Sequence, residues 1–289
     1  MPDIEKYRER LKYCRLCGHR CEVNRLQGEK GKCNTLAEIR ISSFAPHFGE
    51  EPELVGRFGS GTIFFTNCNL ACVFCQNYDI SHQGKGVKIE PSGLVKVMLD
   101  LQKRGCHNIN WVSPTHLVPL LIPALLEARE QGLNIPLVYN SGGYDSLEAL
   151  EMLDGLVEIY MPDAKYGDPS SAKKYSNAPG YWEMNRAALK EMHRQAGDLV
   201  IENGVAVRGL LVRHLVLPED LAASYEIFKF ISQELSTETY INIMDQYRPC
   251  NDAEAHHELN RRITTDEYRA AIILAKNCGL HRGFQDFYW

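Results

Sequence analysis

Residues 62–77 of this chain read TIFFTNCNLACVFCQN, and they carry its most specific signal. Residues 62–65 are β-branched or aromatic, which predicts a strand. Cys68, Cys72 and Cys75 follow it in the spacing C-x3-C-x2-C. A four-iron cluster normally takes four thiolates, so three at this spacing predict a cluster whose fourth iron is open to a ligand that is not protein.

The same spacing also fits a plain helix, because residues four and seven apart place three small apolar side chains on one stripe. The neighbours of the first cysteine argue against that alternative. Asn67 and Asn69 favour loops and caps, and the predicted strand ends just before them. We therefore predict that the three cysteines lie on a loop beyond a strand end and bind iron.

The cysteine spacing, with the aromatic Phe74 just before the third cysteine, resembles the signature loop of the radical S-adenosylmethionine (radical SAM) superfamily. The resemblance implies that S-adenosylmethionine chelates the open iron and is cleaved by an electron from the reduced cluster to give a 5'-deoxyadenosyl radical. It implies Cys68, Cys72 and Cys75 as the catalytic cluster ligands. It also implies that Phe74 packs near the adenine of the cofactor.

The composition is that of a globular protein, with 289 residues, 44% of them hydrophobic, and a net charge of -5. A negative net charge argues against nucleic acid as the main partner. The first ten residues are rich in charge, and no later run approaches the roughly 18 apolar residues of a membrane helix. We expect no signal segment, no membrane partner and a cytoplasmic location.

A second group of cysteines lies near the N-terminus, at Cys14, Cys17, Cys21 and Cys33. In a chain expected to be intracellular, cysteines suit metal sites better than disulfides. Four thiolates complete a site for zinc or for a second iron-sulfur cluster, and the spacing does not choose the metal. His19 as a replacement ligand and four unligated thiols are the alternatives. We expect a cysteine-rich metal-binding module over residues 1–36 and a radical SAM domain over residues 37–289.

Beyond the cysteine loop, apolar strand patterns alternate with helical ones. Strands are predicted at residues 62–65, 108–112, 136–140, 156–161, 209–217 and 239–244. Helices are predicted near residues 91–104, 118–131, 145–154, 181–196, 219–235 and 265–278. This alternation predicts an α/β fold with a parallel sheet, and it fits the partial (β/α)6 barrel typical of the superfamily. Contacts with cofactor and substrate are then expected at the carboxyl ends of the strands.

Polar residues follow the second and third predicted strands. Ser113 and Thr115 stand where the superfamily often carries a Gly-Gly-Glu-Pro-like run that holds the amino group of the cofactor. The glycines and the glutamate are absent here, but hydroxyls and carbonyls can still accept hydrogen bonds from an ammonium. A Ser-Pro turn that begins the next helix is the alternative. Asn140 ends the third strand, and the glycines after it allow close approach to a ligand or a simple turn.

The run DAK at residues 163–165 resembles the Asp-x-Lys segment of glycyl-radical-enzyme activating proteins, such as the pyruvate formate-lyase activating enzyme. The resemblance implies that Lys165 meets the cofactor carboxylate and that Asp163 supports it; an exposed charged turn is the alternative. Arg213 lies in an apolar strand, where a cation needs a partner or a polar cavity. This strand resembles the arginine-bearing strand of the same activating enzymes, which implies that Arg213 contacts the cofactor or a substrate backbone. Met244 and Gln246 end the sixth strand, near the adenine in that family.

Across about residues 37–250 the order of elements resembles the pyruvate formate-lyase activating enzyme group. We predict a radical SAM enzyme that abstracts hydrogen from a partner protein or peptide and takes electrons from a donor such as flavodoxin or ferredoxin. Radical modification of a small molecule or an RNA base is one alternative. The other is a non-catalytic iron-sulfur or zinc protein that transfers electrons or binds metal, and it predicts no cleavage of S-adenosylmethionine.

Overall fold

The structure is a computed structural model that describes residues 4–284. Parallel strands form its centre and pair in chain order. They are β2 (Ser60–Phe65), β4 (Ile109–Val112), β5 (Leu137–Ser141), β6 (Ile159–Pro162), β8 (Val205–Leu215) and β9 (Tyr240–Met244). These are the strands expected from the sequence, with ends that differ by a few residues, so the predicted α/β fold is confirmed.

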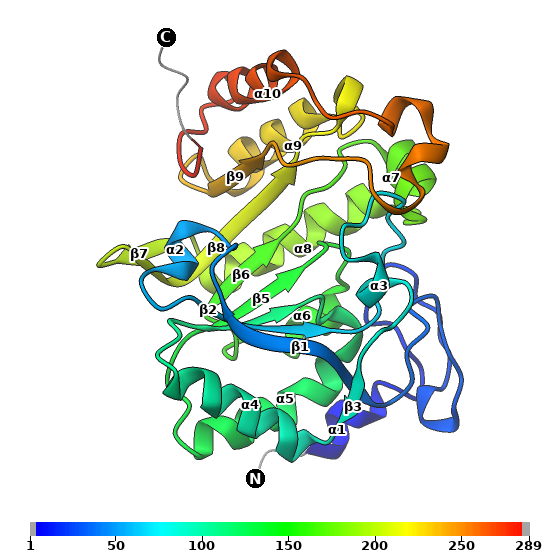
Figure 1. Cartoon of the computed structure of the whole chain (residues 1–289), viewed down its shortest axis with the longest axis vertical. Helices are drawn as coiled ribbons and strands as arrows, with labels where there is room; N and C mark the ends of the chain where they lie inside the picture. Colours follow the sequence, from blue (N-terminus) through cyan, green and yellow to red (C-terminus); the bar gives the residue numbers. More distant parts are fainter. Residues whose placement is uncertain (1–3, 285–289) are drawn as a thin grey trace.

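Three further strands, which the sequence patterns did not predict, extend the sheet. β1 (Ile39–His47) pairs antiparallel with β2, and β3 (Val87–Ile89) pairs with the start of β1. β7 (Val200–Glu202) forms a hairpin with β8. The order β3-β1-β2-β4-β5-β6-β8, with β9 also on β8, leaves β1 and β9 on opposite sides of the parallel strands. The sheet is therefore mostly open, as a partial barrel requires (Figure 1).

Helices cover the outside of this sheet. In Figure 1, α4 and α5 lie at the bottom and α9 and α10 at the top. The helices are α1 (Ile4–Glu9), α2 (Pro52–Val55), α3 (Tyr78–Ser81), α4 (Pro91–Lys103), α5 (Val118–Glu130), α6 (Leu147–Glu151), α7 (Pro169–Ser176), α8 (Tyr181–Ala196), α9 (Ser224–Phe230) and α10 (Thr265–Asn277). A π-helical turn, Ile231–Leu235, continues α9. Every helix within residues 4–284 is too short or too polar to span a bilayer.

Side chains alternate along the strands between two cores. Those that point outward, such as Ile63, Trp111 and Leu210, pack in the large core beneath the helices. Those that point into the barrel, such as Val138 and Ile159, form a smaller core. This alternation assigns the residues of each strand either to the helix side or to the barrel interior.

Leu54 closes the smaller core from one end of the barrel. It belongs to the connection between β1 and β2, is fully buried, and packs with Val138, Ile159, Met161 and Leu211. The proline that starts α2, Pro52, helps to fix the turn that brings Leu54 inward. The interior at this end is thus apolar and filled, which leaves the opposite end for chemistry.

The N-terminal segment packs directly on the barrel. Leu11 and Leu16 share a buried cluster with Cys14 and with Ala149 of α6. Cys17 forms an isolated bridge with Asp145, at the start of the turn that leads into α6. The core of this segment is therefore shared with the barrel, whereas its role as a metal-binding module stays a prediction.

We expect Leu54→Ala to destabilise the fold by about 2–5 kcal/mol, because it opens a cavity at the closed end of the barrel. Urea unfolding of the metal-free protein gives the measurement. Ile273→Ala is the control, since Ile273 on α10 is about half exposed. Equal unfolding midpoints for the two variants would contradict the placement of Leu54 in the interior.

Candidate active site

The cysteine loop begins where β2 ends. Asn67 adopts a left-handed conformation with φ of 66°, which turns the chain out of the strand. The backbone N–H groups of Ala71 and Val73 donate to the carbonyls of Ser176 and Tyr175, at 3.0 and 2.8 Å. The loop is thus held against the C-terminal end of α7, at the carboxyl ends of the parallel strands.

The three sulfur atoms of this loop lie near one another. Burial, with smaller contributions from the neighbouring Cys72 and Cys75, raises the pKa of Cys68 to about 12. Each sulfur has a polar neighbour: the Leu70 N–H lies 3.4 Å from Cys68, the Ser176 hydroxyl 2.9 Å from Cys72, and the Ser81 hydroxyl 3.1 Å from Cys75. Donors of this kind stabilise a thiolate, the form that binds metal.

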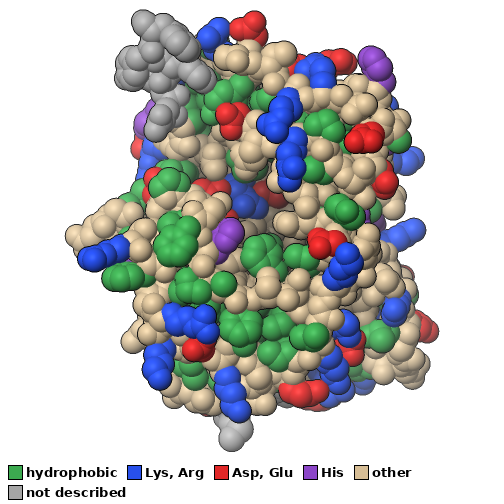
Figure 2. Space-filling model, viewed as in Figure 1, with side chains coloured by type: hydrophobic (Ala, Val, Ile, Leu, Met, Phe, Trp, Pro, Cys, Tyr) green, Lys and Arg blue, Asp and Glu red, His purple; other side chains and the backbone are tan. Residues whose placement is uncertain are grey.

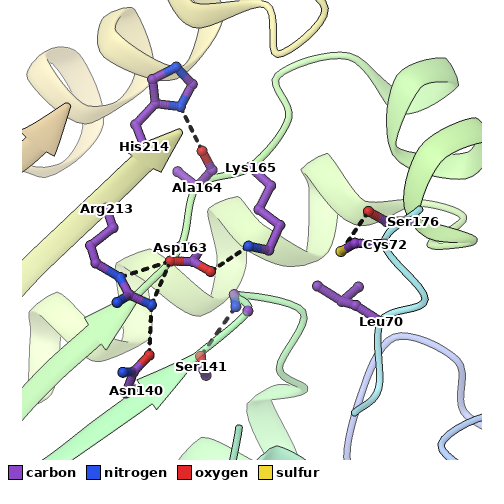
Figure 3. A network of polar contacts seen from close by, with 12 residues as sticks. Leu70, Cys72, Asn140, Ser141, Asp163, Ala164, Lys165, Ser176, Arg213 and His214 are labelled. Carbon is purple, nitrogen blue, oxygen red and sulfur yellow. Dashed lines mark hydrogen bonds and ion pairs between the residues drawn. The ribbon is translucent and has the colours of Figure 1, made fainter. Parts of the chain in front are cut away.

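A buried group of charges lies beside the cysteine loop. Asp163, just past β6, stands between two cations (Figure 3). Its Oδ1 accepts from Nε of Arg213 at 2.9 Å, and its Oδ2 accepts from Nζ of Lys165 at 2.5 Å. Nη2 of Arg213 also donates to Oδ1 of Asn140 at 2.7 Å. The ends of β5, β6 and β8 are thereby joined through side chains.

The pKa values in this group follow from its charges. Burial alone would raise the pKa of Asp163, but Arg213 and Lys165 hold it below its ordinary value. Burial alone would lower the pKa of Lys165, but Asp163 raises it. Burial raises the pKa of Cys72, and the charge of Lys165 offsets part of that rise. All three charged residues are therefore ionised at neutral pH, and the lysine extends its positive charge toward the sulfurs.

Gly143 allows the end of β5 to approach this group closely. Its φ is 71°, and a Cβ at this position would lie 2.0 Å from the carbonyl oxygen of Asp163. Only glycine fits there without moving the backbone. The structure shows a turn at these glycines that packs on the Asp163 carbonyl, while close approach to a ligand stays a prediction.

Ser113 and Thr115 differ in their surroundings. Ser113 has a φ of 56° and donates its backbone N–H to the carbonyl of Asn140 at 2.8 Å, at the end of β4. Thr115 is buried, and its hydroxyl donates to Asp145 at 2.7 Å. Asp145 also accepts from the hydroxyls of Tyr139 and Ser141. The Thr115 hydroxyl therefore already donates its hydrogen bond to Asp145, whereas Ser113 lies at the ends of the parallel strands.

The remaining predicted contacts line the other side of the loop. Phe74 is buried edge-on against Tyr166 and Tyr247, with ring centroids 6.5 and 5.7 Å away. Gln246 donates its side-chain amide to the sulfur of Met244 at 3.1 Å, and its carbonyl accepts from Gln76 at 3.3 Å. The end of β9 therefore reaches the residue that follows Cys75.

The N-terminal cysteines lie next to this site. Burial raises the pKa of Cys17, and the nearby thiols of Cys33, Cys14 and Cys21 raise it further. Gly31 makes room for one of them, since a Cβ there would lie 2.8 Å from the sulfur of Cys21. Across residues 4–284 no three Cys, His, Asp or Glu side chains form a preformed cage for a metal ion. In each group the thiols thus lie near one another, without a preformed metal cage among the described residues.

Two contacts join the N-terminal segment to the cysteine loop. Nε2 of His19 lies 2.9 Å from the carbonyl oxygen of Asn69, so this ring faces the loop. Buried Arg25 donates to the carbonyl of His116 at 2.6 Å, and Nε2 of His116 lies 3.0 Å from the carbonyl oxygen of Thr66. The N-terminal segment therefore contacts the start of the cysteine loop, directly at Asn69 and through His116 at Thr66.

A model of the radical SAM superfamily matches residues 62–228. The chain belongs to the radical SAM superfamily. Members of this superfamily bind a four-iron, four-sulfur cluster and S-adenosylmethionine, and the cysteine loop within the matched residues offers three thiols, the type of donor that such a cluster takes. Membership makes the chain an enzyme of this class, without assigning it to the activating-enzyme group.

The chain is 34% identical to the uncharacterized protein MJ0674 of Methanocaldococcus jannaschii, over 96% of this chain and 78% of that protein. Among solved structures it resembles HydG, a maturase of the [FeFe]-hydrogenase, with 8% identity and a TM-score of 0.51 over 74% of this chain and 47% of that chain. It also resembles SuiB of Streptococcus suis bound to precursor peptide SuiA, with 10% identity and a TM-score of 0.50 over 76% and 47%. At these identities the structural likeness concerns the fold alone.

Several residues of the site carried no signal in the sequence. Ser176 and Ser81 are single serines in polar helices, and Glu50 and Glu51 lie in a segment without strand or helix periodicity. Glu50 nevertheless reaches Arg213, with Oε2 at 3.6 Å from Nη1. The one hint in the sequence was the pair of acidic residues before Pro52, and only the tertiary structure shows that Glu50 lies near Arg213.

Asp163→Asn should destabilise the protein by about 3–5 kcal/mol, because it leaves Arg213 and Lys165 buried without their shared carboxylate. The free energy of urea unfolding of the metal-free protein measures this. Asp266→Asn, at an exposed position of α10, is the control with the same change of charge. An Asp163 variant as stable as the control would disprove the coupling of these charges.

Stability should also depend on pH through His116. Burial and the neighbouring Arg25 lower the pKa of His116 to about 3. The unfolded chain takes up this proton near pH 6.5, so stability is full above that pH and is lost as the pH falls toward 3, by about 1.4 kcal/mol per pH unit.

In His116→Gln this part of the pH dependence should disappear. Urea unfolding at several values between pH 7 and 4 provides the test. His257→Gln, which removes an exposed histidine, should retain the slope of the wild type. An unchanged slope in His116→Gln would show that this histidine is not held neutral.

Proposed function

We propose that this protein is a radical SAM enzyme that abstracts a hydrogen atom from a partner protein or peptide. The observation that carries the proposal is that the cysteine loop lies beside the charged group of Asp163, Lys165 and Arg213, at the carboxyl ends of the strands. When bound, the cluster and S-adenosylmethionine supply a carbon radical by reductive cleavage. Electrons would come from a donor such as flavodoxin or ferredoxin.

The chain's own residues would bind and orient the cofactor. Lys165 would hold its carboxylate, because this ammonium lies at the strand ends and influences the sulfur of Cys72. Arg213 and Asn140 would fix Asp163 so that the lysine keeps its position. Ser113, Phe74, Met244 and Gln246 complete the proposed cofactor contacts, whereas Thr115 is left out because its buried hydroxyl donates to Asp145.

Three features support a macromolecular substrate. Figure 2 shows a hollow on one face, with basic and acidic side chains on its floor and hydrophobic side chains beside it. Phe44 on β1 and Phe48 just after it are 36% and 62% exposed. Residues 43–47 of β1 pair with β2 on one side, and no strand within residues 4–284 pairs with their other side. An open strand edge can accept an extended peptide.

We further propose that Cys14, Cys17, Cys21 and Cys33 bind zinc or a second iron-sulfur cluster. The space left by Gly31 and the Lys32 N–H, which lies 3.3 Å from the sulfur of Cys21, support thiolate ligands there. A metal at this place would brace the segment that contacts Asn69 and Thr66.

Replacing Cys68, Cys72 and Cys75 together by Ala should abolish the cluster and all production of 5'-deoxyadenosine, because the open iron is lost. Anaerobic reconstitution, electron paramagnetic resonance and chromatography of the products test this. Metal analysis of the same variant reports on the N-terminal site, where retained zinc would rule out a second cluster. Cys250→Ala, outside both groups, is the control and should behave like the wild type.

The nature of the substrate can be tested with deuterium. Reduced holoenzyme is incubated with fractions of a lysate from the native organism grown in heavy water, and deuterium in 5'-deoxyadenosine is measured by mass spectrometry. The proposal expects transfer from the dialysed macromolecular fraction, with loss of the signal after protease treatment. Transfer only from the small-molecule fraction, or loss after ribonuclease treatment, would favour the alternatives instead.

A further inference from the structure

The connection between β1 and β2 carries two carboxylates into the barrel. Leu54 of this connection packs against the inward side chains of β5, β6 and β8. Glu50 and Glu51 precede it and lie closer to the charged group, since Oε2 of Glu50 is 3.6 Å from Nη1 of Arg213 and Glu51 contacts Asn242, the residue paired with Arg213 on the next strand. The carboxylates therefore stand between the apolar end of the interior and Arg213.

Glu51 is only partly satisfied by the protein. Its side chain precedes α2, where a carboxylate could accept from the first N–H groups, but it makes no such bond. Oε1 instead accepts from the side-chain amide of Asn242 on β9 at 3.0 Å. Oε2 is buried and has no hydrogen-bond partner among the described residues, although Glu51 is only 5% exposed.

Glu50 is likewise held loosely. Its Oε2 lies 3.6 Å from Nη1 of Arg213, longer than a hydrogen bond, because that guanidinium already donates to Asp163 and Asn140. Burial raises the pKa of Glu50 to about 6, and Arg213 offsets only part of that effect. This carboxylate can therefore accept further donors.

Asn110 adds a third polar group to the same region. Its neighbours Ile109 and Trp111 belong to the outer core, so by alternation Asn110 points into the barrel. It is fully buried, and a weak contact from its amide to Glu50 lowers the pKa of that carboxyl, but neither amide atom has a partner within hydrogen-bonding geometry among residues 4–284. A buried polar atom without a partner carries the cost of its desolvation, which a ligand that bonds to it would offset.

The charges identify the kind of ligand. Glu50, Glu51 and Asp163 are three carboxylates, whereas Arg213 and Lys165 are two cations. The surplus is negative, and the free acceptors are Oε2 of Glu51 and Oδ1 of Asn110, with Glu50 beside them. We propose that this region binds the cationic nitrogen of the substrate, an ammonium or a guanidinium group.

This inference rests on the proposed function and narrows the substrate to one that carries a basic group. Arg213 and Lys165 retain 17% and 19% exposure of their side chains, so the charged group is reached from solvent. The hollow in Figure 2 has charged side chains on its floor. A substrate held by its nitrogen below Arg213 would direct its carbon chain toward the end of the barrel that carries the cysteine loop.

The test measures binding, without turnover, in the full-length reconstituted protein saturated with S-adenosylmethionine. Calorimetric titration with n-pentylamine and with agmatine should give saturable binding, whereas 1-pentanol and valerate should give none. Glu51→Gln and Glu50→Gln should each weaken amine binding by about tenfold or more, since each removes a charge-assisted hydrogen bond. Glu254→Gln, at an exposed position, should bind like the wild type.

Thermal unfolding of each variant shows whether it is folded, so that lost binding is not mistaken for lost structure. Absence of amine binding in the wild type, or equal binding in Glu51→Gln, overturns the proposal. So does amine binding that is seen without S-adenosylmethionine but is lost in the saturated protein, because the carboxylates would then be cofactor ligands. Failure to form 5'-deoxyadenosine would overturn the proposed function instead, and it is recorded in a separate assay.

Discussion

The shared carboxylate of Asp163 is the interaction on which the site depends. Two buried cations at the ends of neighbouring strands would repel each other, and each would pay a large desolvation cost without a partner. One carboxylate placed between them neutralises part of that charge and fixes their separation. Because Asp163 follows β6, Arg213 lies on β8 and Asn140 ends β5, the same contacts also hold three strand ends in register. The contacts that orient these charged side chains are therefore the same contacts that fix the positions of the three strand ends.

The sequence predicted those parts of the fold that depend on local pattern. The six parallel strands are runs of β-branched and aromatic residues, and helices such as α8 show clear apolar spacing, so their positions follow from short-range rules. β1 was missed because residues 43–47 include Ser43, Ala45 and Pro46 and lie largely exposed at an edge. α7, with the sequence PSSAKKYS, was missed because it has little apolar periodicity.

The site could be predicted only as far as its residues carry a spacing. Cys68, Cys72 and Cys75 form a motif, and Asp163 and Lys165 stand two residues apart, so both groups were visible before the fold was known. Ser176 and Glu51 reach the site from elements far away in sequence, and no spacing relates them to the cysteines. The interior of the barrel is apolar at one end only. Leu54 and its neighbours fill that end, while charges occupy the other.

The division of the interior into two ends bears on how a radical enzyme controls its reaction. Leu54 and its apolar neighbours exclude water from the closed end of the barrel, but they offer no polar group that can orient a substrate. Polar groups beyond this apolar core can orient a substrate, because hydrogen bonds are directional and are stronger where water is scarce. Asn110 and Glu51 remain incompletely paired inside a well-packed protein, and native structures rarely tolerate such groups without a reason. The unpaired atoms lie between the apolar core around Leu54 and the charged group around Asp163. A substrate has to be held at this place if its carbon atoms are to face the cysteine loop.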